Sequence, residues 1–312
     1  MTRLSQGDSR SYLFLVAAAA AWGVATVISK RAVTEIPPLA LLPIQLSTSV
    51  AVIGVVMRVR GDRLSWTGDT ARLGLLGFLN PGLSYALGLI GLTQITASLS
   101  VVLWATEPLM ILLLAAWFLR ESITTPMAGA LGAATIGVGL VVVESGTAGT
   151  LPGIALTLAG VAACAIYTVV VRRWMGDDST LAVLTAQQIC ALLFSLTVLG
   201  LVFVSGNGPD LSGWSSTAWI SAAVSGLLYY AIAFWFYLTA LRRIPAAVAG
   251  LFLNLIPIFG VGSGYLILDE RLRALQSLGA VLIVTSVGAI LWIRSRTQLL
   301  TLRSPSIIVD DR

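Results

Sequence analysis

Residues 107–121 read EPLMILLLAAWFLRE, and residues 256–270 read IPIFGVGSGYLILDE. In both stretches a proline is followed 13 residues later by a glutamate (121 − 108 and 270 − 257). The two prolines lie 149 residues apart (257 − 108), and the residues between proline and glutamate are mostly apolar. Each stretch belongs to a segment that is long and apolar enough to cross a lipid bilayer. The chain therefore carries two copies of one membrane-spanning pattern.

The composition of the chain is that of a membrane protein. Of its 312 residues, 57% are hydrophobic and 11% are charged, whereas a soluble domain has about 25% charged residues. Repeated runs of about 20 apolar residues predict an all-α integral membrane protein, because a β-barrel would show shorter segments of alternating polarity. The net charge of +5 comes from basic residues at the ends of the apolar runs. We attribute it to orientation in the membrane and predict no nucleic-acid partner.

Ten apolar runs, separated by charged or turn-forming residues, predict ten transmembrane helices. None of the breaks is long enough to hold a soluble domain. The first run ends in Lys30-Arg31 without a clear processing site, so we interpret it as a retained helix and not as a signal peptide. The predicted spans are residues 11–30, 39–57, 72–92, 96–119, 127–144, 151–173, 180–204, 216–240, 246–268 and 275–294.

The basic residues are divided unevenly between the two sides of the predicted membrane. One side holds Lys30, Arg31, Arg271 and Arg273, and the opposite side holds the other 15 of the 19 Lys and Arg residues. Basic residues concentrate on the cytoplasmic side of membrane proteins. We therefore predict a multi-pass protein of the plasma (inner) membrane with its N- and C-termini in the cytoplasm, which requires an even number of spans.

The repeat covers the whole chain. At an offset of 142 Gln45 aligns with Gln187, and at an offset of 149 Tyr85 aligns with Phe234. Each half holds five spans, and because five is odd the halves enter the membrane from opposite sides. Such inverted repeats are typical of secondary transporters that work by alternating access around a central cavity. The predicted domains are a first five-helix repeat (1–146), a second five-helix repeat (147–296) and a polar cytoplasmic tail (297–312).

Several motifs resemble one family. Ala21-Trp22-Gly23 followed by Lys30 is similar to the opening of EamA-type members of the drug/metabolite transporter superfamily. Residues 255–258, 268–272 and 279–283 are similar to the repeat motif of that family. The resemblance implies ten helices in two inverted five-helix repeats and the export of amino acids, metabolites or drugs. The aromatic content also resembles the aromatic amino acid exporters of this superfamily.

The first copy of the repeat departs from the family pattern. Ser122 follows Glu121 where arginine is usual, and Glu107 precedes Pro108 where an apolar residue is commoner. Glu107 lies near the middle of its span, where a charge costs about 2.5–3.5 kcal/mol, so we expect it to face a cavity or a partner. It is either a proton-linked or amine-binding carboxylate or a brace for a helix kink. Pro108 and Pro257 are the predicted kinks, because proline removes a backbone hydrogen bond.

Aromatic and polar residues deep within the spans are the other candidates for solute binding. Trp and Tyr usually anchor at the membrane interface, but some of these lie too deep for that role and either line a cavity or pack between helices. Asn, Gln and Tyr within spans either contact solute or hydrogen-bond to neighbouring helices. The predicted substrate-binding residues are Trp22, Gln45, Asn80, Tyr85, Trp104, Glu107, Tyr167, Gln187, Tyr230, Trp235 and Asn254.

The residue types present argue against several kinds of chemistry. The chain contains no histidine, which excludes His-based metal sites, catalytic triads and proton relays. Cys164 and Cys190 lack metal-ligand spacing. A membrane enzyme would need clustered acids, bases or metal ligands near one interface, whereas the carboxylates here are scattered. We therefore predict no enzyme activity, no metal and no cofactor.

These observations predict a secondary transporter that exports small metabolites, with aromatic or other apolar amino acids as the leading class. A multidrug or other metabolite exporter of the same fold is the alternative, and an integral membrane enzyme is a weaker one. The expected partners are a small-molecule solute and the lipid bilayer. Protons are a candidate coupling ion, and a monomer is compatible with the sequence.

Overall fold

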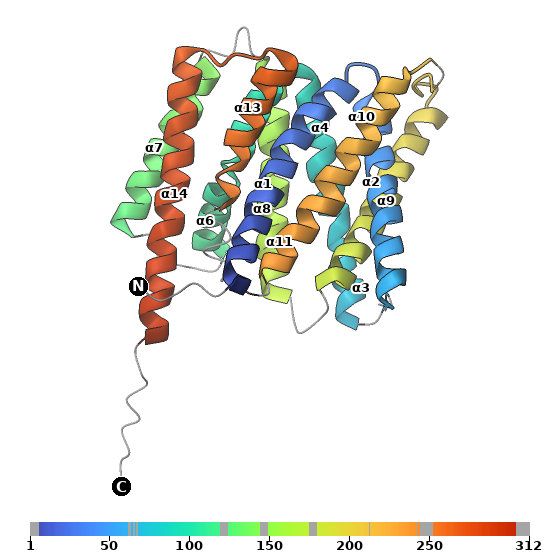
Figure 1. Cartoon of the computed structure of the whole chain (residues 1–312). Helices are drawn as coiled ribbons and strands as arrows, with labels where there is room; N and C mark the ends of the chain where they lie inside the picture. The colour runs from blue at the N-terminus through green and yellow to red at the C-terminus, as the bar shows by residue number, and fades with distance from the viewer. Residues whose placement is uncertain are drawn as a thin grey trace.

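The computed structural model describes residues 6–61, 64, 66, 68–118, 124–143, 149–174, 180–211, 213–241, 243 and 252–303. These residues form a bundle of helices that stand side by side (Figure 1). The α-helices are α1 (Gln6–Ala32), α2 (Pro38–Arg60), α3 (Gly68–Leu75), α4 (Ser84–Gln94), α5 (Ala97–Trp104), α6 (Glu107–Phe118), α7 (Thr125–Val143), α8 (Leu151–Trp174), α9 (Thr180–Val204), α10 (Ser216–Gly226), α11 (Ala233–Leu241), α13 (Ile256–Leu268) and α14 (Ala274–Arg303). The tight turn η1 (Leu76–Phe78) and the wide turn η2 (Leu79–Leu83) join α3 to α4, and the wide turn η4 (Leu227–Ile232) joins α10 to α11.

The helices match the predicted spans in position. Six described segments are long and apolar enough to cross a membrane by length and composition, and they coincide with the first, second, third, sixth, seventh and eighth predicted spans. Four shorter apolar helices coincide with the remaining spans: Ala97–Ile111, Thr125–Leu140, Ile256–Leu268 and Ala274–Ile290. The all-helical apolar class is confirmed, and the number of ten spans stays a prediction.

Three spans are interrupted beside a proline. The span predicted at 96–119 consists of two helices, α5 and α6, and the break lies just before Glu107 and Pro108. α13 likewise begins one residue before Pro257. In η2 the backbone of Asn80, which precedes a proline, is extended (φ −143°, ψ 121°). Proline causes such breaks because it lacks an N–H donor and disfavours the helical conformation in the residue before it.

The two halves pack through equivalent contacts. α1 packs against α13, and its counterpart α8 packs against α6. α7 lies beside α14 and α2 beside α9, at opposite edges of the bundle in Figure 1. Lys30 near the end of α1 and the amide of Thr150 before α8 both donate to carbonyls near the end of α4. α1 and α8 therefore run in opposite directions, as inverted repeats require.

Two glycines show the same equivalence in atomic detail. Gly226 in α10 lies so close to α2 that a Cβ atom there would be 2.5 Å from the backbone oxygen of Gln45. Gly77 in η1 lies in the same way against the backbone of Gln187 in α9. The offsets of 142 and 149 convert one pair into the other (45 + 142 = 187 and 77 + 149 = 226). Glycine permits this backbone approach because it has no side chain.

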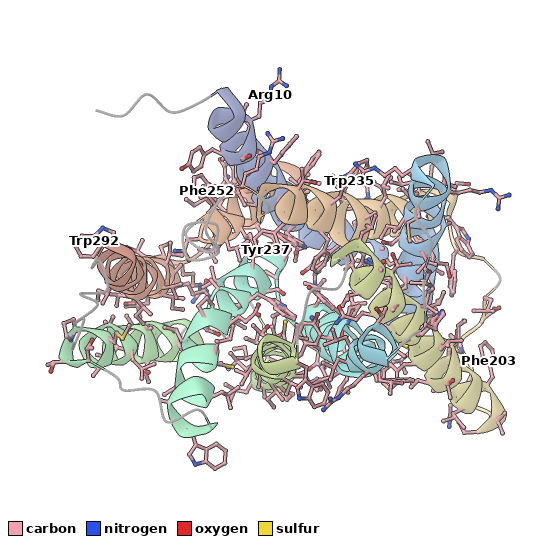
Figure 2. All side chains as sticks on the ribbon, turned by 90° about the horizontal axis from the view of Figure 1, so that it is seen from below. Arg10, Phe203, Trp235, Tyr237, Phe252 and Trp292 are labelled. Atoms are coloured by element: carbon pink, nitrogen blue, oxygen red, sulfur yellow. The ribbon has the colours of Figure 1, made fainter. Side chains whose placement is uncertain are left out.

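The outer surface of the bundle is apolar, and polar groups lie inside. Val59, Val204 and Leu266 are 82%, 87% and 81% exposed, and Phe203 and Trp292 lie at the outside of the bundle in Figure 2. The buried residues, by contrast, include many Ser, Thr and Gln side chains. An apolar exterior around a partly polar interior is the pattern expected of helices that are surrounded by lipid.

Candidate functional site

A pocket with an empty volume of about 310 Å³ lies between α1, α2, α4, α5 and η4. This volume includes space that is open to solvent. Four predicted substrate-binding residues contribute to it: Gln45, Tyr85, Trp104 and Tyr230. The other lining residues are Thr26, Ser29, Gly88, Leu89, Leu92, Ser100 and Tyr229.

One wall of the pocket is aromatic, with Tyr85 of α4 at its centre. The rings of Tyr85 and Trp104 stack with their centroids 5.2 Å apart and their planes 14° apart. Tyr229 and Tyr230 of η4 meet the Tyr85 ring edge-on, with centroid distances of 5.1 and 5.3 Å. Aromatic faces of this kind attract other rings and cationic groups. The wide turn η4 places the two adjacent tyrosines so that both reach the same ring.

Another wall is polar, and Gln45 of α2 is its main residue. The side-chain amide of Gln45 is almost fully buried, and its Nε2 donates to the hydroxyls of Ser29 (2.9 Å) and Ser225 (2.7 Å). Its Oε1 has no hydrogen-bond partner among the described residues. A buried carbonyl oxygen without a partner carries a free-energy cost.

Gln187, the residue that aligns with Gln45 in the second half, has a different environment. Its Oε1 accepts a hydrogen bond from the hydroxyl of Tyr167 at 2.7 Å, and its Nε2 donates to the backbone carbonyl of Leu73 at 3.2 Å. Both ends of this amide are therefore engaged by the protein. Tyr167 and Gln187, both predicted to bind solute, meet each other and do not line the pocket.

Glu107 lies at the start of α6, just beyond the break that follows Trp104. Its Oε1 accepts long hydrogen bonds from the Cys164 thiol (3.3 Å) and the Thr168 hydroxyl (3.4 Å), both on α8. The carboxyl group thus has the partner that its depth demands, but it is not part of the pocket lining. These contacts tie α6 to α8 and leave both predicted roles of Glu107 open.

Trp22 and Trp235 lie outside the pocket. Trp22 is only 8% exposed and packs edge-on against Phe234 of α11, with the ring centroids 5.1 Å apart. Trp235 is 40% exposed, and the guanidinium group of Arg60 lies over its ring at 5.6 Å. Trp22 therefore packs between helices, and Trp235 lies on the outside of α11, as an interfacial anchor would.

Asn80 and Asn254 also lie outside the pocket. The side-chain oxygen of Asn80 accepts a hydrogen bond from the Ser84 hydroxyl at 2.6 Å, across the wide turn η2. Asn254 is half-buried just before α13, and its Nδ2 lies 3.5 Å from the position that a Cβ atom would occupy at Gly288. The structure thus places Asn80 at a backbone irregularity and Asn254 against α14.

Some lining residues were not among the predicted ones. Tyr229 adjoins Tyr230 in the aromatic segment of the eighth predicted span, so the sequence did contain a signal for it. Thr26, Ser29 and Ser100 are short hydroxyl residues within apolar runs. Such residues commonly bond to the preceding turn of their own helix, and their types alone do not distinguish that role from lining a pocket.

Comparison with known proteins agrees with this architecture. The model of the EamA-like transporter family matches the chain twice, at residues 9–143 and 151–292. The chain belongs to the EamA-like transporter family. One relative is an uncharacterized transporter of Archaeoglobus fulgidus, which is 24% identical to this chain over 278 residues. The match covers 96% of that protein and 88% of this chain. The uncharacterized transporter YetK of Bacillus subtilis is 24% identical over 287 residues, which are 85% of its length and 89% of this chain.

One solved crystal structure shares the fold of this EamA-like transporter. The two superimpose with a TM-score of 0.64 at 18% sequence identity, over 93% of this chain and 99% of the other. The predicted resemblance to the EamA-type family is confirmed, and the protein is a multi-pass membrane transporter with a small-molecule solute.

Proposed function

We propose that this EamA-like transporter exports small amphipathic metabolites, with amino acids that carry an aromatic or other apolar side chain as the leading class. The observation that carries the proposal is the pocket, in which the partnerless Oε1 of Gln45 is combined with the aromatic wall around Tyr85. An apolar or ring-bearing side chain fits the aromatic wall, because aromatic pairs favour stacked and edge-on contacts. An ammonium group fits the free carbonyl oxygen, because it offers only donors.

The geometry also suggests how the solute is oriented. The Gln45 carbonyl would accept from the ammonium group, while the hydroxyls of Ser29 and Ser100, which also line the pocket, can donate to a carboxylate. Alternating access between the inverted halves would then expose this site to each side in turn. We further propose the plasma membrane as the location, with both termini in the cytoplasm and with protons as the candidate coupling ion.

The proposal is tested by measuring the uptake of two related solutes by the wild type and by a Gln45 variant. Purified protein in liposomes is assayed for uptake of a ring-bearing amino acid and of its deaminated analogue, which keeps the carboxylate but lacks the amine. A hydrogen bond to a charged group contributes about 1.5–3 kcal/mol, so the wild type should prefer the amino acid roughly tenfold or more. Gln45→Leu should abolish this preference.

Gln187→Leu is the matched control, because it removes the same group at the equivalent position, where both ends are engaged by the protein. It is expected to lower stability and to leave the preference for the amine unchanged. The proposal fails if Gln45→Leu and Gln187→Leu change the preference equally. Uptake of bulky cationic drugs in place of amino acids would instead favour a multidrug exporter.

A further inference from the structure

Lys30, in the last turn of α1, holds the end of α4. Its ammonium group donates hydrogen bonds to the backbone carbonyls of Leu92 and Ile95, at 2.7 Å each. The last carbonyls of a helix lack partners within the helix and carry partial negative charge, so a cation stabilises this end. Lys30 is only partly exposed, which distinguishes it from the exposed neighbour Arg31.

Glu270, directly after α13, holds the start of α5. Its Oε1 accepts from the amide of Ala97 at 2.9 Å, and its Oε2 accepts from the amide of Ser98 at 2.8 Å. These are the first two amides of α5, which have no acceptors within the helix. Hydrogen bonds to a carboxylate are stronger than those between neutral groups. Glu270 belongs to the second half of the chain and α5 to the first, so the contact joins the two halves.

The local backbone directs Glu270 to this position. Asp269 adopts the left-handed conformation (φ 52°), and the amide of Glu270 donates back to the carbonyl of Gly264 at 3.1 Å. Asp tolerates this conformation better than most residues. Gly264 lets α5 approach, because a Cβ atom there would lie 2.5 Å from the Ser98 hydroxyl and 3.1 Å from Oε2 of Glu270.

Both contacts border the pocket. Leu92, which accepts from Lys30, is a lining residue, and so is Ser29, the residue before Lys30. α5, which Glu270 holds at its start, carries the lining residues Ser100 and Trp104. The pocket wall formed by α4 and α5 is therefore fixed at this end by one cation and one anion, from α1 and α13. The predicted topology places this end away from the cytoplasm.

We propose that Lys30 and Glu270 form a latch that closes the pocket toward the non-cytoplasmic side. Opening to that side requires Glu270 to release the first amides of α5, so that α5 moves away from α13 and carries Trp104 with it. Lys30 keeps the end of α4 against α1 and sets the pivot of this motion. The latch acts in the solute-free protein, so this proposal does not depend on which solute is transported.

Hydrogen exchange measured on the solute-free protein tests the first step. Glu270→Gln keeps the shape of the side chain but leaves one acceptor oxygen for two amides, so exchange at Ala97 and Ser98 should accelerate by roughly tenfold or more. Asp269→Asn is the matched control, since Asn also tolerates the left-handed conformation and Asp269 is 82% exposed. Unchanged exchange in Glu270→Gln, or an equal change in both variants, would overturn the latch.

The direction of opening needs a second readout. With Cys164→Ser and Cys190→Ala in place, Ser100→Cys reports access to the pocket through its labelling by a membrane-impermeant maleimide in vesicles of either orientation. Glu270→Gln should raise the labelling rate several-fold from the non-cytoplasmic side and lower it, or leave it unchanged, from the other. A rise that is equal from both sides would show that Glu270 only stabilises the fold.

A pair of glycine variants covers the case in which Glu270→Gln does not fold. Gly264→Ala places a methyl group against Ser98 and Glu270, whereas Gly262→Ala, in the same helix, meets nothing within 4 Å. Gly264→Ala should therefore reproduce the one-sided rise in labelling, and Gly262→Ala should behave as the wild type. Identical labelling in the two variants would contradict the proposal even if no transported solute has been found.

Discussion

The close approach of Gly226 to α2 gives a quantitative prediction for the packing of the two halves. In Gly226→Ala the new Cβ atom would lie 2.5 Å from the backbone oxygen of Gln45 and 2.6 Å from its Cα atom. Both helices are fixed by other contacts, so neither backbone can give way cheaply. Inserting a methyl group into such a contact costs about 1–3 kcal/mol, and alanine returns about 0.5–1 kcal/mol through its better helix propensity. These ranges leave a net loss of about 0–2.5 kcal/mol in the free energy of unfolding, with a middle value of about 1 kcal/mol.

Gly200→Ala is the control for this prediction. Gly200 lies in α9 on the exposed side of the bundle, and an added Cβ atom there meets nothing within 4 Å. The Gly200→Ala variant gains helix propensity without a clash, so its melting temperature should equal or exceed that of the wild type. The assay is thermal unfolding of both purified variants in the same detergent. If Gly226→Ala melts at or above the temperature of Gly200→Ala, the described approach of α10 to α2 is wrong.

Two further predictions concern carboxylates. Glu107→Gln should fold, and it should flatten the pH dependence of solute uptake if the carboxylate is linked to protons. A pH profile identical to that of the wild type would mean that Glu107 only braces α6 against α8. Glu35, between α1 and α2, accepts from the Ser215 amide and hydroxyl at 2.8 Å each, and these bonds lower its pKa below the ordinary value of 4.5. The contribution of Glu35 to stability is present above pH 4.5 and is lost as the pH falls through the lowered pKa. Between pH 7 and about pH 3 the melting temperature of the wild type should therefore fall further than that of Glu35→Gln. Equal falls in the two proteins would contradict this prediction.

Much of the fold could be predicted because its causes are local. Runs of apolar residues require helices in lipid, since every backbone polar group must be satisfied within the segment. The break between α5 and α6 follows from Pro108 in the same direct way. The contact of Glu270 with α5 could not be predicted in this way, because its partner Ser98 is 172 residues away and no local pattern marks that pairing. Glu121, the counterpart of Glu270 in the first copy, lies outside the described residues.

The sequence could not predict which face of a buried helix lines the pocket. Tyr230 lies in the wide turn η4 and Trp235 lies in α11, and the two side chains face different sides of the bundle. Only one of them could line a pocket on the inner side. The surrounding segment is apolar on all sides, and such a helix gives no indication of which face is inner. Tyr230 is buried in the pocket wall, and Trp235 is exposed.

The aromatic wall of the pocket has different side chains at the equivalent positions of the second half. The offset of 149 relates Tyr85 to Phe234 and Trp104 to Leu253. Phe234 and Leu253 belong to one apolar cluster around Trp22, whereas Tyr85 and Trp104 line the pocket. The counterparts of the stacked pair Tyr85 and Trp104 are thus apolar side chains in a packed cluster. This cluster also includes Tyr229, which lines the pocket, so the two places adjoin each other.

The same comparison explains the position of Glu107. The offset of 149 relates it to Ile256, and the offset of 142 relates its partner Cys164 to Trp22. Ile256 packs against the cluster that contains Trp22, just as Glu107 contacts Cys164. Of these two equivalent contacts between the halves, one is therefore polar and the other is apolar. The two halves thus share their backbone packing and differ in the side chains that make the contact. The difference leaves the carboxylate of Glu107 without a counterpart, so the symmetric backbone holds an asymmetric set of side chains.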